Sequence, residues 1–304
     1  GGISLAIAAT ALGTFPILLF GSDEQKKKYL PDIAAGKKLA AFGLTEANAG
    51  SDALSMKTSA VRDGDFYLLN GTKQWITNGE NAEIYTIIAK TNPAKGARGL
   101  SAFIVEKGTP GFSFGKHEDK MGIRASSTTE LVFQDCKVPA ANLLSREGMG
   151  AVVFITTLNN SRPGVGAQAL GIAAGALEDA VKYSRERIQF GAPISSFQAI
   201  QHMLADMATQ IEAARALMYA TARTIDSGEK RFSKESAMSK LFCSDVAMKV
   251  TVDAIQVMGG YGYMREYPME KRMRDAKITQ IYEGTNQIQR NEIALNLIKG
   301  AAAG

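Results

Sequence analysis

The stretch "DGDFYLLNGTKQWITNG", residues Asp63–Gly79, decides the class of fold. Three turn dipeptides, Asp63–Gly64, Asn70–Gly71 and Asn78–Gly79, separate short runs of strand-forming residues. Such dipeptides favour tight turns between antiparallel strands. Comparable runs follow as "IYTIIA", "LSAFIVE" and "TELVFQD". The pattern predicts a central antiparallel β domain over residues 39–147, either a small barrel or a sandwich.

A helical segment precedes this β region. The charged part, "GSDEQKKKYLPDIAAG", begins with a potential capping box in which Ser22 caps the helix and Gln25 bonds back to it. Gly36 is a plausible end of that helix. Residues 1–38 are therefore expected to be the remnant of an N-terminal helical domain.

The first twenty residues, "GGISLAIAATALGTFPILLF", carry no charge. That length could span a bilayer. Gly13, Thr14 and Pro16 interrupt the segment, however, and no basic residue precedes it. The missing basic flank also disfavours a signal peptide. We expect a buried helix from a domain whose beginning lies outside this sequence.

Residues 148–304 return to helical patterns. Apolar residues at helical spacing predict one amphipathic helix at Ile200, Met203, Leu204, Met207, Ile211, Ala214 and Met218. A second helix is indicated by Met238, Leu241, Phe242, Val252 and Ile255. Gly166, Gly171 and Gly175 predict a helix that neighbours approach closely. Short loops favour a C-terminal four-helix bundle with these stripes in its core, so the fold class is α+β with several domains.

Composition excludes several classes of function. The 304 residues include 35 Lys plus Arg and 30 Asp plus Glu, a net charge of +5 that does not indicate a nucleic-acid binder. The densest basic stretch, Lys271–Arg274, has acidic neighbours and reads as a solvated helix face. Two cysteines and two histidines, all far apart, predict neither a disulfide framework nor a metal site. The sequence contains no P-loop and no G-x-G-x-x-G motif after a strand.

A lone carboxylate, Glu283, stands in "ITQIYEGTNQIQR", residues Ile278–Arg290. Its neighbours are apolar or aromatic on one side and amides on the other. On the residues alone two interpretations remain. Glu283 can be a carboxylate near a helix N-terminus that interacts with the helix dipole, or it can be a base held in an apolar site.

Four motifs occur in order across nearly the whole chain: "FGLTEANAGSD" (Phe42–Asp52), "QWITNG" (Gln74–Gly79), "RERIQFG" (Arg185–Gly191) and "QVMGGYGY" through "IYEGTNQIQR" (Gln256–Arg290). Each is weak alone, but together they resemble the acyl-CoA dehydrogenase family. The family fold is similar to the one expected here, with an N-terminal helical domain, a central antiparallel β domain and a C-terminal four-helix bundle. The resemblance implies the divisions 1–38, 39–147 and 148–304, the last carrying the catalytic loop.

The resemblance implies FAD as the cofactor. The isoalloxazine ring would lie against residues of the first two motifs, namely Phe42, Leu44, Thr45, Ser51, Trp75 and Thr77. The pyrophosphate and adenosine would be held, partly by a neighbouring subunit, through Arg187, Gln198, Gln256, Val257, Met258, Gly259 and Gly260. Thr285 and Gln287 would complete the site. Each side chain also has an ordinary alternative, such as a core aromatic for Trp75 or a surface helix arginine for Arg187.

The resemblance also implies the chemistry. Glu283 would be the catalytic base that removes the pro-R α-proton of an acyl-CoA thioester while a β-hydride passes to flavin N5, giving a trans-2-enoyl-CoA. The predicted substrate-binding residues are Ser51, Arg162, Gly284 and Arg290. Some relatives carry the base at the position of Ser161, which has no carboxylate here, so the match favours Glu283.

Partners and context follow from the same resemblance. Electrons would pass to an electron-transfer flavoprotein, and the enzyme would be a homotetramer, a dimer of dimers, acting in fatty acid β-oxidation and lipid metabolism. A bacterial enzyme would be cytoplasmic and a eukaryotic one would lie in the mitochondrial matrix. The motifs "ALGTFP", "AFIVEKGTPGFSFG" and "RDAKITQIYEGT" favour the short-chain, butyryl-CoA members. Three alternatives stay open: an acyl-CoA oxidase, an enoyl-CoA reductase and a non-catalytic flavin-bound scaffold.

Overall fold

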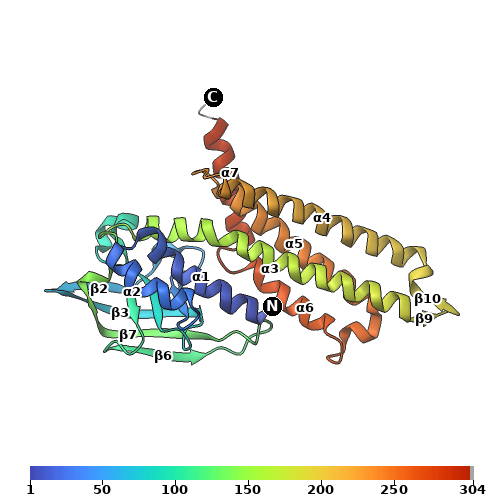
Figure 1. The fold of residues 1–304 in the computed structure, drawn as a ribbon, viewed down its shortest axis with the longest axis horizontal. Helices are drawn as coiled ribbons and strands as arrows, with labels where there is room; N and C mark the ends of the chain where they lie inside the picture. Colours follow the sequence, from blue (N-terminus) through green and yellow to red (C-terminus); the bar gives the residue numbers. More distant parts are fainter. Residues whose placement is uncertain (302–304) are drawn as a thin grey trace. The chain divides into compact units, whose positions relative to one another are not determined.

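The computed structural model describes residues 1–301 and divides into two compact units (Figure 1). The β unit comprises residues 2–120 and 124–161, and the helical unit comprises residue 1, residues 121–123 and the chain from Arg162 onward. The three-domain division expected from the sequence stays a prediction, and residues 302–304 of its last domain lie outside the described part.

Seven α-helices are found among the described residues. Their bounds are α1 (Gly2–Phe20), α2 (Asp23–Ala34), α3 (Gly150–Glu186), α4 (Gln198–Asp226), α5 (Ser233–Met258), α6 (Met269–Lys277) and α7 (Asn286–Ala301). Short 3₁₀ turns connect the elements: η1 (Ala53–Ser55), η2 (Pro93–Gly99), η3 (Ala140–Asn142), η4 (Ile194–Ser196), η5 (Gly259–Tyr263) and η6 (Ile278–Gln280).

The β unit contains one eight-stranded sheet. Its strands are β1 (Ala40–Gly43), β2 (Ser59–Asp63), β3 (Phe66–Thr77), β4 (Ile84–Lys90), β5 (Leu100–Glu106), β6 (Phe112–His117), β7 (Thr128–Pro139) and β8 (Leu143–Leu144). The order is β6-β7-β3-β2-β4-β5-β8, with β1 beside β4. Most neighbours are antiparallel, as predicted, but β1 and β2 each run parallel to β4.

Burial on both faces explains why β4 and β5 do not alternate between apolar and polar residues. Each is buried at six consecutive positions. One face packs with Ile17 of α1, Tyr29 of α2 and Phe154 of α3, and the opposite face packs around aromatic residues such as Tyr67 and Phe103. A strand covered on both faces loses the alternation of a half-exposed strand.

The predicted turns were partly wrong. Asp63–Gly64 does form the β2–β3 turn, and Asn78–Gly79 ends β3 with Asn78 at a φ of 62°. Asn70–Gly71, by contrast, lies inside β3, which continues as a single strand at a register shift against β7. A Cβ on Gly71 would lie 2.6 Å from Thr58 Oγ1, so glycine is needed there for close approach rather than for a turn.

Helix α1 is continuous through Gly13, Thr14 and Pro16, which we had expected to interrupt it. By length and composition it is the one described helix that could cross a membrane, with 28% of its window buried. Its inner face is buried but its outer face, including Ile3 (76% exposed), is open, so the expectation of a buried helix was only partly right. Polar side chains of the sheet bond its backbone: Asn78 Nδ2 donates to Ala6 O at 2.9 Å and Thr86 Oγ1 to Gly13 O at 3.1 Å.

Helix α2 begins with the predicted capping box. Ser22 Oγ accepts from the Gln25 N–H, and Gln25 Oε1 accepts from the Ser22 N–H. The Gln25 amide also donates to the carbonyls of Ala141 and Leu143. The cap therefore both starts the helix and fastens it to the strand β8.

The helical unit has its core between α3, α4 and α5, which lie side by side (Figure 1). The predicted α4 stripe is confirmed, because its central members are buried: Met207, Ile211, Ala214 and Met218. The α5 stripe was partly wrong, because Phe242 and Val252 are exposed and smaller residues face the core instead: Ala237, Cys243, Val246, Ala247, Val250 and Ala254.

The three glycines of α3 serve different purposes. A Cβ on Gly166 would meet Ser239 O of α5 at 3.2 Å, and one on Gly175 would meet the Arg272 guanidinium at 2.4 Å. Both confirm the predicted close approach. Nothing lies within 4 Å of a Cβ on Gly171, so that position needs no glycine for packing.

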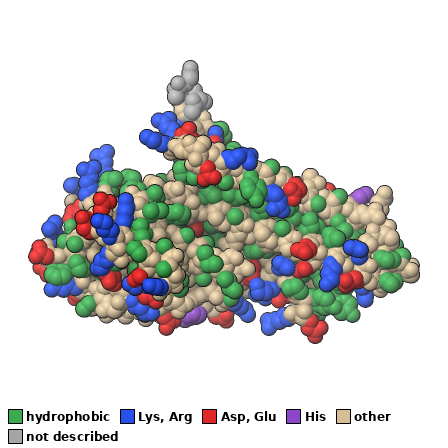
Figure 2. Space-filling model, in the orientation of Figure 1, with side chains coloured by type: hydrophobic (Ala, Val, Ile, Leu, Met, Phe, Trp, Pro, Cys, Tyr) green, Lys and Arg blue, Asp and Glu red, His purple; other side chains and the backbone are tan. Residues whose placement is uncertain are grey.

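The basic run Lys271–Arg274 lies on α6, where Lys271 is exposed and the other three residues are half-buried, so the predicted solvated helix face is only partly confirmed. Arg272 donates through Nε and Nη2 to Asp179 Oδ2, and Arg274 pairs with Glu270 at 2.6 Å. Acidic and basic side chains are also interspersed over the coloured part of the face drawn in Figure 2.

Helix α1 should tolerate no side chain at Gly13. A Cβ there would lie 2.6 Å from Ala41 N of β1, so Gly13→Ala should force helix and strand apart and lower the free energy of unfolding by about 2 kcal/mol. The matched change Gly171→Ala in α3 should raise it by about 0.5–1 kcal/mol. Urea denaturation of both variants measures this, and equal effects of the two changes would contradict the packing described.

Candidate active site

A pocket of the helical unit forms where α3 and α5 end. The hairpin of β9 (Ile188–Gln189) and β10 (Ala192–Pro193) follows α3, and Phe190 and Gly191 turn it with φ values of 53° and 79°. Helix α5 stops at Gly259, whose φ is 59°. Both chain reversals use left-handed backbone conformations. They bring the start of the hairpin and the glycines after α5 to the same pocket.

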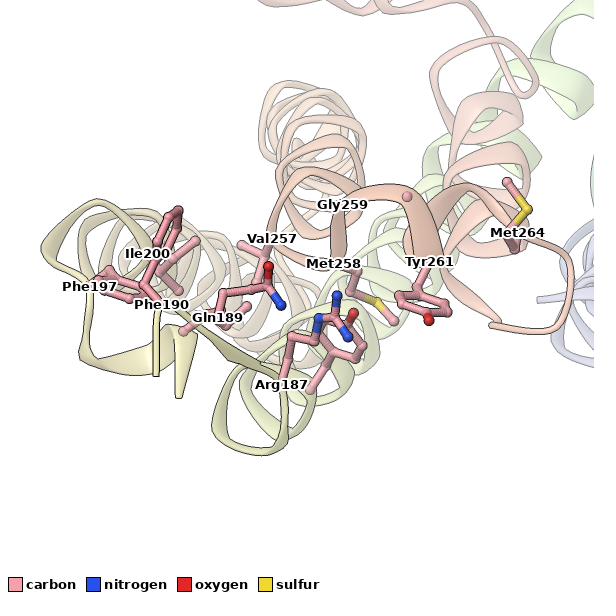
Figure 3. Close-up of a pocket in the computed structure, with 13 residues that line it drawn as sticks. Arg187, Gln189, Phe190, Phe197, Ile200, Val257, Met258, Gly259, Tyr261 and Met264 are labelled. Carbon is pink, nitrogen blue, oxygen red and sulfur yellow. The ribbon is translucent and has the colours of Figure 1, made fainter. Parts of the chain in front are cut away.

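The hollow has a volume of about 620 Å³ and is mostly apolar and aromatic (Figure 3). Phe190 and Phe197 meet edge to face at one end, with ring centroids 5.9 Å apart. The Arg187 guanidinium lies 5.2 Å from the centroid of the Tyr261 ring, a cation–π arrangement. None of the lining residues that the structure describes carries a carboxylate. The pocket is lined by Tyr183, Arg187, Gln189, Phe190, Ile194, Phe197, Ile200, Val257, Met258, Gly259, Gly260, Tyr261 and Met264.

The pocket unites part of the set predicted for the pyrophosphate and adenosine. Arg187 and the run Val257–Gly260 line it together. A Cβ on Gly259 or Gly260 would meet nothing within 4 Å, so their backbone is open to a bound group. Gln198 and Gln256 are exposed and do not line the hollow, although each is close in sequence to residues that do.

Two predicted residues lie at the start of α7. Thr285 Oγ1 accepts from the Ile288 N–H at 3.3 Å, which caps the start of α7. Gln287 is exposed. Their predicted roles toward the cofactor stay predictions.

A second group of predicted residues belongs to the β unit. Thr45 O accepts from the Gln74 N–H at 2.8 Å, so the segment after β1 runs beside the end of β3. Trp75 has a φ of 58° at a register shift of β3 and is 53% exposed. The bulge turns this aromatic ring outward, which excludes the alternative of a core aromatic.

The remaining β-unit residues differ in exposure. Thr77 is half-buried and pairs with Thr128 of β7. Phe42 is buried at the centre of β1, and Leu44 and Thr45 are half-buried. Ser51 is exposed and follows a turn in which the Glu46 and Ala49 backbones exchange hydrogen bonds.

A buried ion pair, which sequence reasoning missed, lies beneath this segment. Lys73 Nζ contacts Glu46 Oε1 at 2.8 Å and donates to Leu44 O at 3.0 Å, and the lysine is fully buried. Glu46 also accepts from the N–H groups of Lys57 and Thr58. Burial lowers the pKa of Lys73, and the charge of Glu46 opposes this shift. Burial raises the pKa of the Glu46 carboxyl, but the charge of Lys73 and the hydrogen bonds to Glu46 outweigh burial, so that pKa is lowered.

The loop between η6 and α7 carries Glu283 in a left-handed conformation. Its φ is 53° and that of Gly284 is 88°. A non-glycine residue in this region costs about 1–2 kcal/mol and persists only where the surroundings enforce it. The Glu283 carbonyl accepts from Arg162 Nε of α3 at 3.2 Å and from Gln289 Nε2 of α7 at 3.1 Å.

Arg162 is therefore no solvent-exposed helix arginine. It is only 7% exposed, and burial lowers its pKa, with Glu292 and Glu283 opposing this. Arg290, in contrast, is exposed, and its guanidinium pairs with Asp245 Oδ2 at 3.0 Å. Ser161 donates its hydroxyl to Leu158 O at 3.3 Å and offers no carboxylate.

A second residue missed by sequence reasoning is Lys240 of α5, which is fully buried. Its Nζ donates to Gly284 O at 2.8 Å and to Asn286 Oδ1 at 2.9 Å. Burial lowers the pKa of Lys240 to about 7, with Glu283 opposing this shift. The one sign of its burial in the sequence is that it lies among the small core-facing residues of α5. A search for large apolar residues does not find these small residues.

Comparison with known proteins covers nearly the whole chain. Family models match as the acyl-CoA dehydrogenase N-terminal domain (residues 1–37), middle domain (41–136) and C-terminal domain (148–298). The chain belongs to the acyl-CoA dehydrogenase family. It is an oxidoreductase with FAD as its cofactor, as the resemblance implied.

Similar proteins include both dehydrogenases and a reductase. The structure of butyryl-CoA dehydrogenase from Megasphaera elsdenii is 53% identical with a TM-score of 0.96, covering 98% of this chain and 78% of its own. A chain solved in work on the electron transferring flavoprotein of Acidaminococcus fermentans is 56% identical with a TM-score of 0.96, covering 97% and 78%. Acryloyl-CoA reductase (NADH) of Anaerotignum propionicum is 55% identical, covering 93% and 72%.

The pocket of the helical unit fits part of FAD. A guanidinium matches the geometry and charge of a pyrophosphate, and bare glycine backbone allows it to approach. The aromatic end suits a planar base. Arg187, Val257, Met258, Gly259 and Gly260 are the residues of this dehydrogenase that would hold the dinucleotide there.

Removing one partner of the Lys73–Glu46 pair should destabilise the β unit strongly. Lys73→Met leaves the Glu46 carboxylate buried without its cation, so the free energy of unfolding should fall by about 3–5 kcal/mol. The double variant Lys73→Met/Glu46→Gln removes the buried charge and keeps an acceptor oxygen for one of the two N–H groups, so it should recover part of the loss. Urea denaturation decides this, and a double variant less stable than the single one would contradict it.

Lys240 should make stability depend on pH in one direction. Its folded pKa of about 7 lies below the ordinary 10.5. Between pH 7 and pH 10.5 Lys240 binds more protons in the unfolded chain than in the folded one. The contribution of Lys240 to the free energy of unfolding therefore rises by up to about 1.4 kcal/mol per pH unit. Lys240→Met lacks this rise, and its stability relative to the parent should therefore fall from pH 7 to pH 9.

The control for this titration is Lys249→Met, on the same helix. Lys249 is exposed and pairs with Asp253, which raises its pKa, so it does not titrate in this range. Urea midpoints at pH 7, 8 and 9 should give a flat difference for Lys249→Met. Equal slopes for the two variants would contradict the lowered pKa of Lys240.

Proposed function

We propose that this dehydrogenase oxidises a short-chain acyl-CoA thioester to the trans-2-enoyl-CoA, with Glu283 as the base that removes the α-proton. The observation that carries the proposal is the backbone of Glu283. A strained, left-handed glutamate bonded through its carbonyl to two helices is the kind of residue that folded proteins keep at reaction sites.

The side chains divide the work in this proposal. Glu283 accepts the α-proton on a carboxylate oxygen, and its N–H is assigned to the thioester oxygen, where negative charge develops. Gly284 has no Cβ, which lets the Gln289 amide approach the loop, since a Cβ there would lie 2.8 Å from Gln289 Nε2. Bound FAD supplies the acceptor for the β-hydride.

Substrate binding is assigned to Ser51, Arg162, Gly284 and Arg290. A buried arginine such as Arg162 suits an anionic or carbonyl-rich ligand because its guanidinium offers several donors in one plane. Its Nε donates to the Glu283 carbonyl, so this arginine contacts the base loop directly. Arg290 is assigned the same anionic end of CoA, at the exposed side of α7.

The cofactor contacts beyond the pocket are also proposed. The flavin ring is assigned to Phe42, Leu44, Thr45, Ser51, Trp75 and Thr77, and the rest of FAD to Arg187, Gln198, Gln256, Val257, Met258, Gly259, Gly260, Thr285 and Gln287. The outward bulge at Trp75 supports the first set. The shared pocket of Arg187 and Val257–Gly260 supports the second.

The biological setting is proposed from the relatives. We assign three domains, residues 1–38, 39–147 and 148–304, in a homotetramer whose FAD sites are shared between subunits. The electron acceptor is an electron-transfer flavoprotein, which the similar chain from Acidaminococcus fermentans supports. The bacterial relatives support a cytoplasmic place in fatty acid β-oxidation.

A reductase working in the opposite direction is the second candidate. The 55% identity to acryloyl-CoA reductase (NADH) favours it. The same carboxyl would then return a proton to the α-carbon, since a reaction and its reverse use the same groups.

Glu283→Gln should keep FAD bound and abolish turnover. An amide cannot accept the α-proton, so kcat should fall by about 10²- to 10⁴-fold. Anaerobic visible spectra of the variant before and after butyryl-CoA should show flavin that does not bleach, whereas the parent bleaches. The control is Glu266→Gln, an exposed glutamate of the same unit.

Undiminished activity of Glu283→Gln would overturn the assignment of the base. Bleaching by other acyl-CoA esters, ranked by rate, measures the chain length. NADH-dependent reduction of acryloyl-CoA, with and without an electron-transfer flavoprotein, tests the reductase. Rapid reoxidation of the reduced parent by oxygen would instead favour an oxidase.

A further inference from the structure

We propose that Lys240 is a positioning residue, whose hydrogen bond to the Gly284 carbonyl fixes the direction of the Glu283 carboxylate toward the α-carbon. This inference rests on the proposed role of Glu283 as the base. Lys240 belongs to none of the motifs that carry the family resemblance, and it lies on α5, 43 positions before the loop (283 − 240).

The first step is the state of the loop. Glu283 and Gly284 are consecutive left-handed residues, and the penalty for the first must be met by contacts. The donors that the structure gives to their two carbonyls come from three different helices: Arg162 on α3, Lys240 on α5 and Gln289 on α7. Anchors that converge from three helices leave the loop little freedom to rotate.

The second step is that Lys240 is not needed merely to satisfy a buried carbonyl. Gly284 O already accepts from Gln289 Nε2 at 2.9 Å. Burying a lysine is costly, and an apolar side chain of the same volume is often as stable or more so. A cation at this place is therefore better explained by what it does to the loop than by stability.

The third step is the rigidity of the hydrogen-bond network that holds the Lys240 ammonium. Its second acceptor, Asn286 Oδ1, belongs to an amide that donates to Ser244 Oγ at 2.9 Å and to Asp245 Oδ1 at 2.7 Å. Ser244 and Asp245 lie one turn after Lys240 on α5. The loop, the start of α7 and one face of α5 thus form a single hydrogen-bonded network.

The fourth step is electrostatic. The charge of Glu283 acts on Lys240 through the protein interior, so the ammonium acts on the carboxylate in return. Lys240 contacts the main chain of the loop and is not itself assigned to the substrate. Its effect on the reaction is therefore exerted through Glu283.

The experiment compares Lys240→Met with the control Lys249→Met in the FAD-loaded enzyme, using butyryl-CoA and an artificial electron acceptor. The inference predicts that Lys240→Met lowers kcat by about 10- to 100-fold, since small misplacements of a reacting group have effects of that size. KM should change by less than about threefold. The deuterium isotope effect with α-deuterated butyryl-CoA should rise, because proton removal becomes slower.

A second measurement isolates the base. An acyl-CoA with sulfur in place of the β-carbon can lose its α-proton but cannot give up a hydride. Exchange of that proton in D₂O should slow in Lys240→Met by the same factor as kcat. In a Glu283→Gln background Lys240→Met should have no further effect, because the group that it positions is gone.

Lys240→Gln keeps a polar group in the same space and carries the test if the methionine variant does not fold. Either variant with full FAD content and kcat within about twofold of the parent overturns the inference, while Glu283→Gln stays inactive and the proposed function stands. Loss of FAD or of folding in both variants also overturns it, since the role would then be structural. Activity that survives Glu283→Gln overturns the proposed function itself.

Discussion

The arrangement of the helices in the helical unit depends on holding the strained backbone of Glu283 and Gly284 in place. Two consecutive left-handed residues, one of them with a side chain, are held by donors that three helices contribute. None of these helices could move independently without releasing a carbonyl from its donor. The bundle core of α3, α4 and α5, built largely from alanine and other small residues, is what keeps two of the donor helices in register.

The β unit uses the same device. Lys73 is buried, pairs with Glu46 and donates to the carbonyl of Leu44, and so fastens the segment assigned to the flavin ring to the strand that presents Trp75. In both units a buried lysine donates a hydrogen bond to a main-chain carbonyl of a loop that is assigned a reactive or binding role. A long, charged side chain can reach across a packed interior, and its burial is tolerated because its hydrogen bonds are satisfied there.

Relatives that share more than half of their residues with this chain are named for opposite directions of reaction, a butyryl-CoA dehydrogenase and an acryloyl-CoA reductase. A carboxyl that removes an α-proton in one direction returns it in the other, so the base loop does not separate the two. The direction depends instead on the electron partner and on the relative stability of acyl and enoyl thioesters in the site.

The sequence by itself determined the order of helical, β and helical regions, the α2 capping box and the positions of the motifs, because these depend on local patterns of turn, cap and apolar residues. It did not reveal that Asn70–Gly71 lies within a strand, since a glycine needed for close approach to Thr58 looks the same as one needed for a turn. Likewise, nothing near Lys73 in the chain marks it as buried, and the only mark of Lys240 is its place among the small residues of α5. Their partners lie far away in sequence, so only the tertiary structure decided which lysines leave water and which carbonyls they hold.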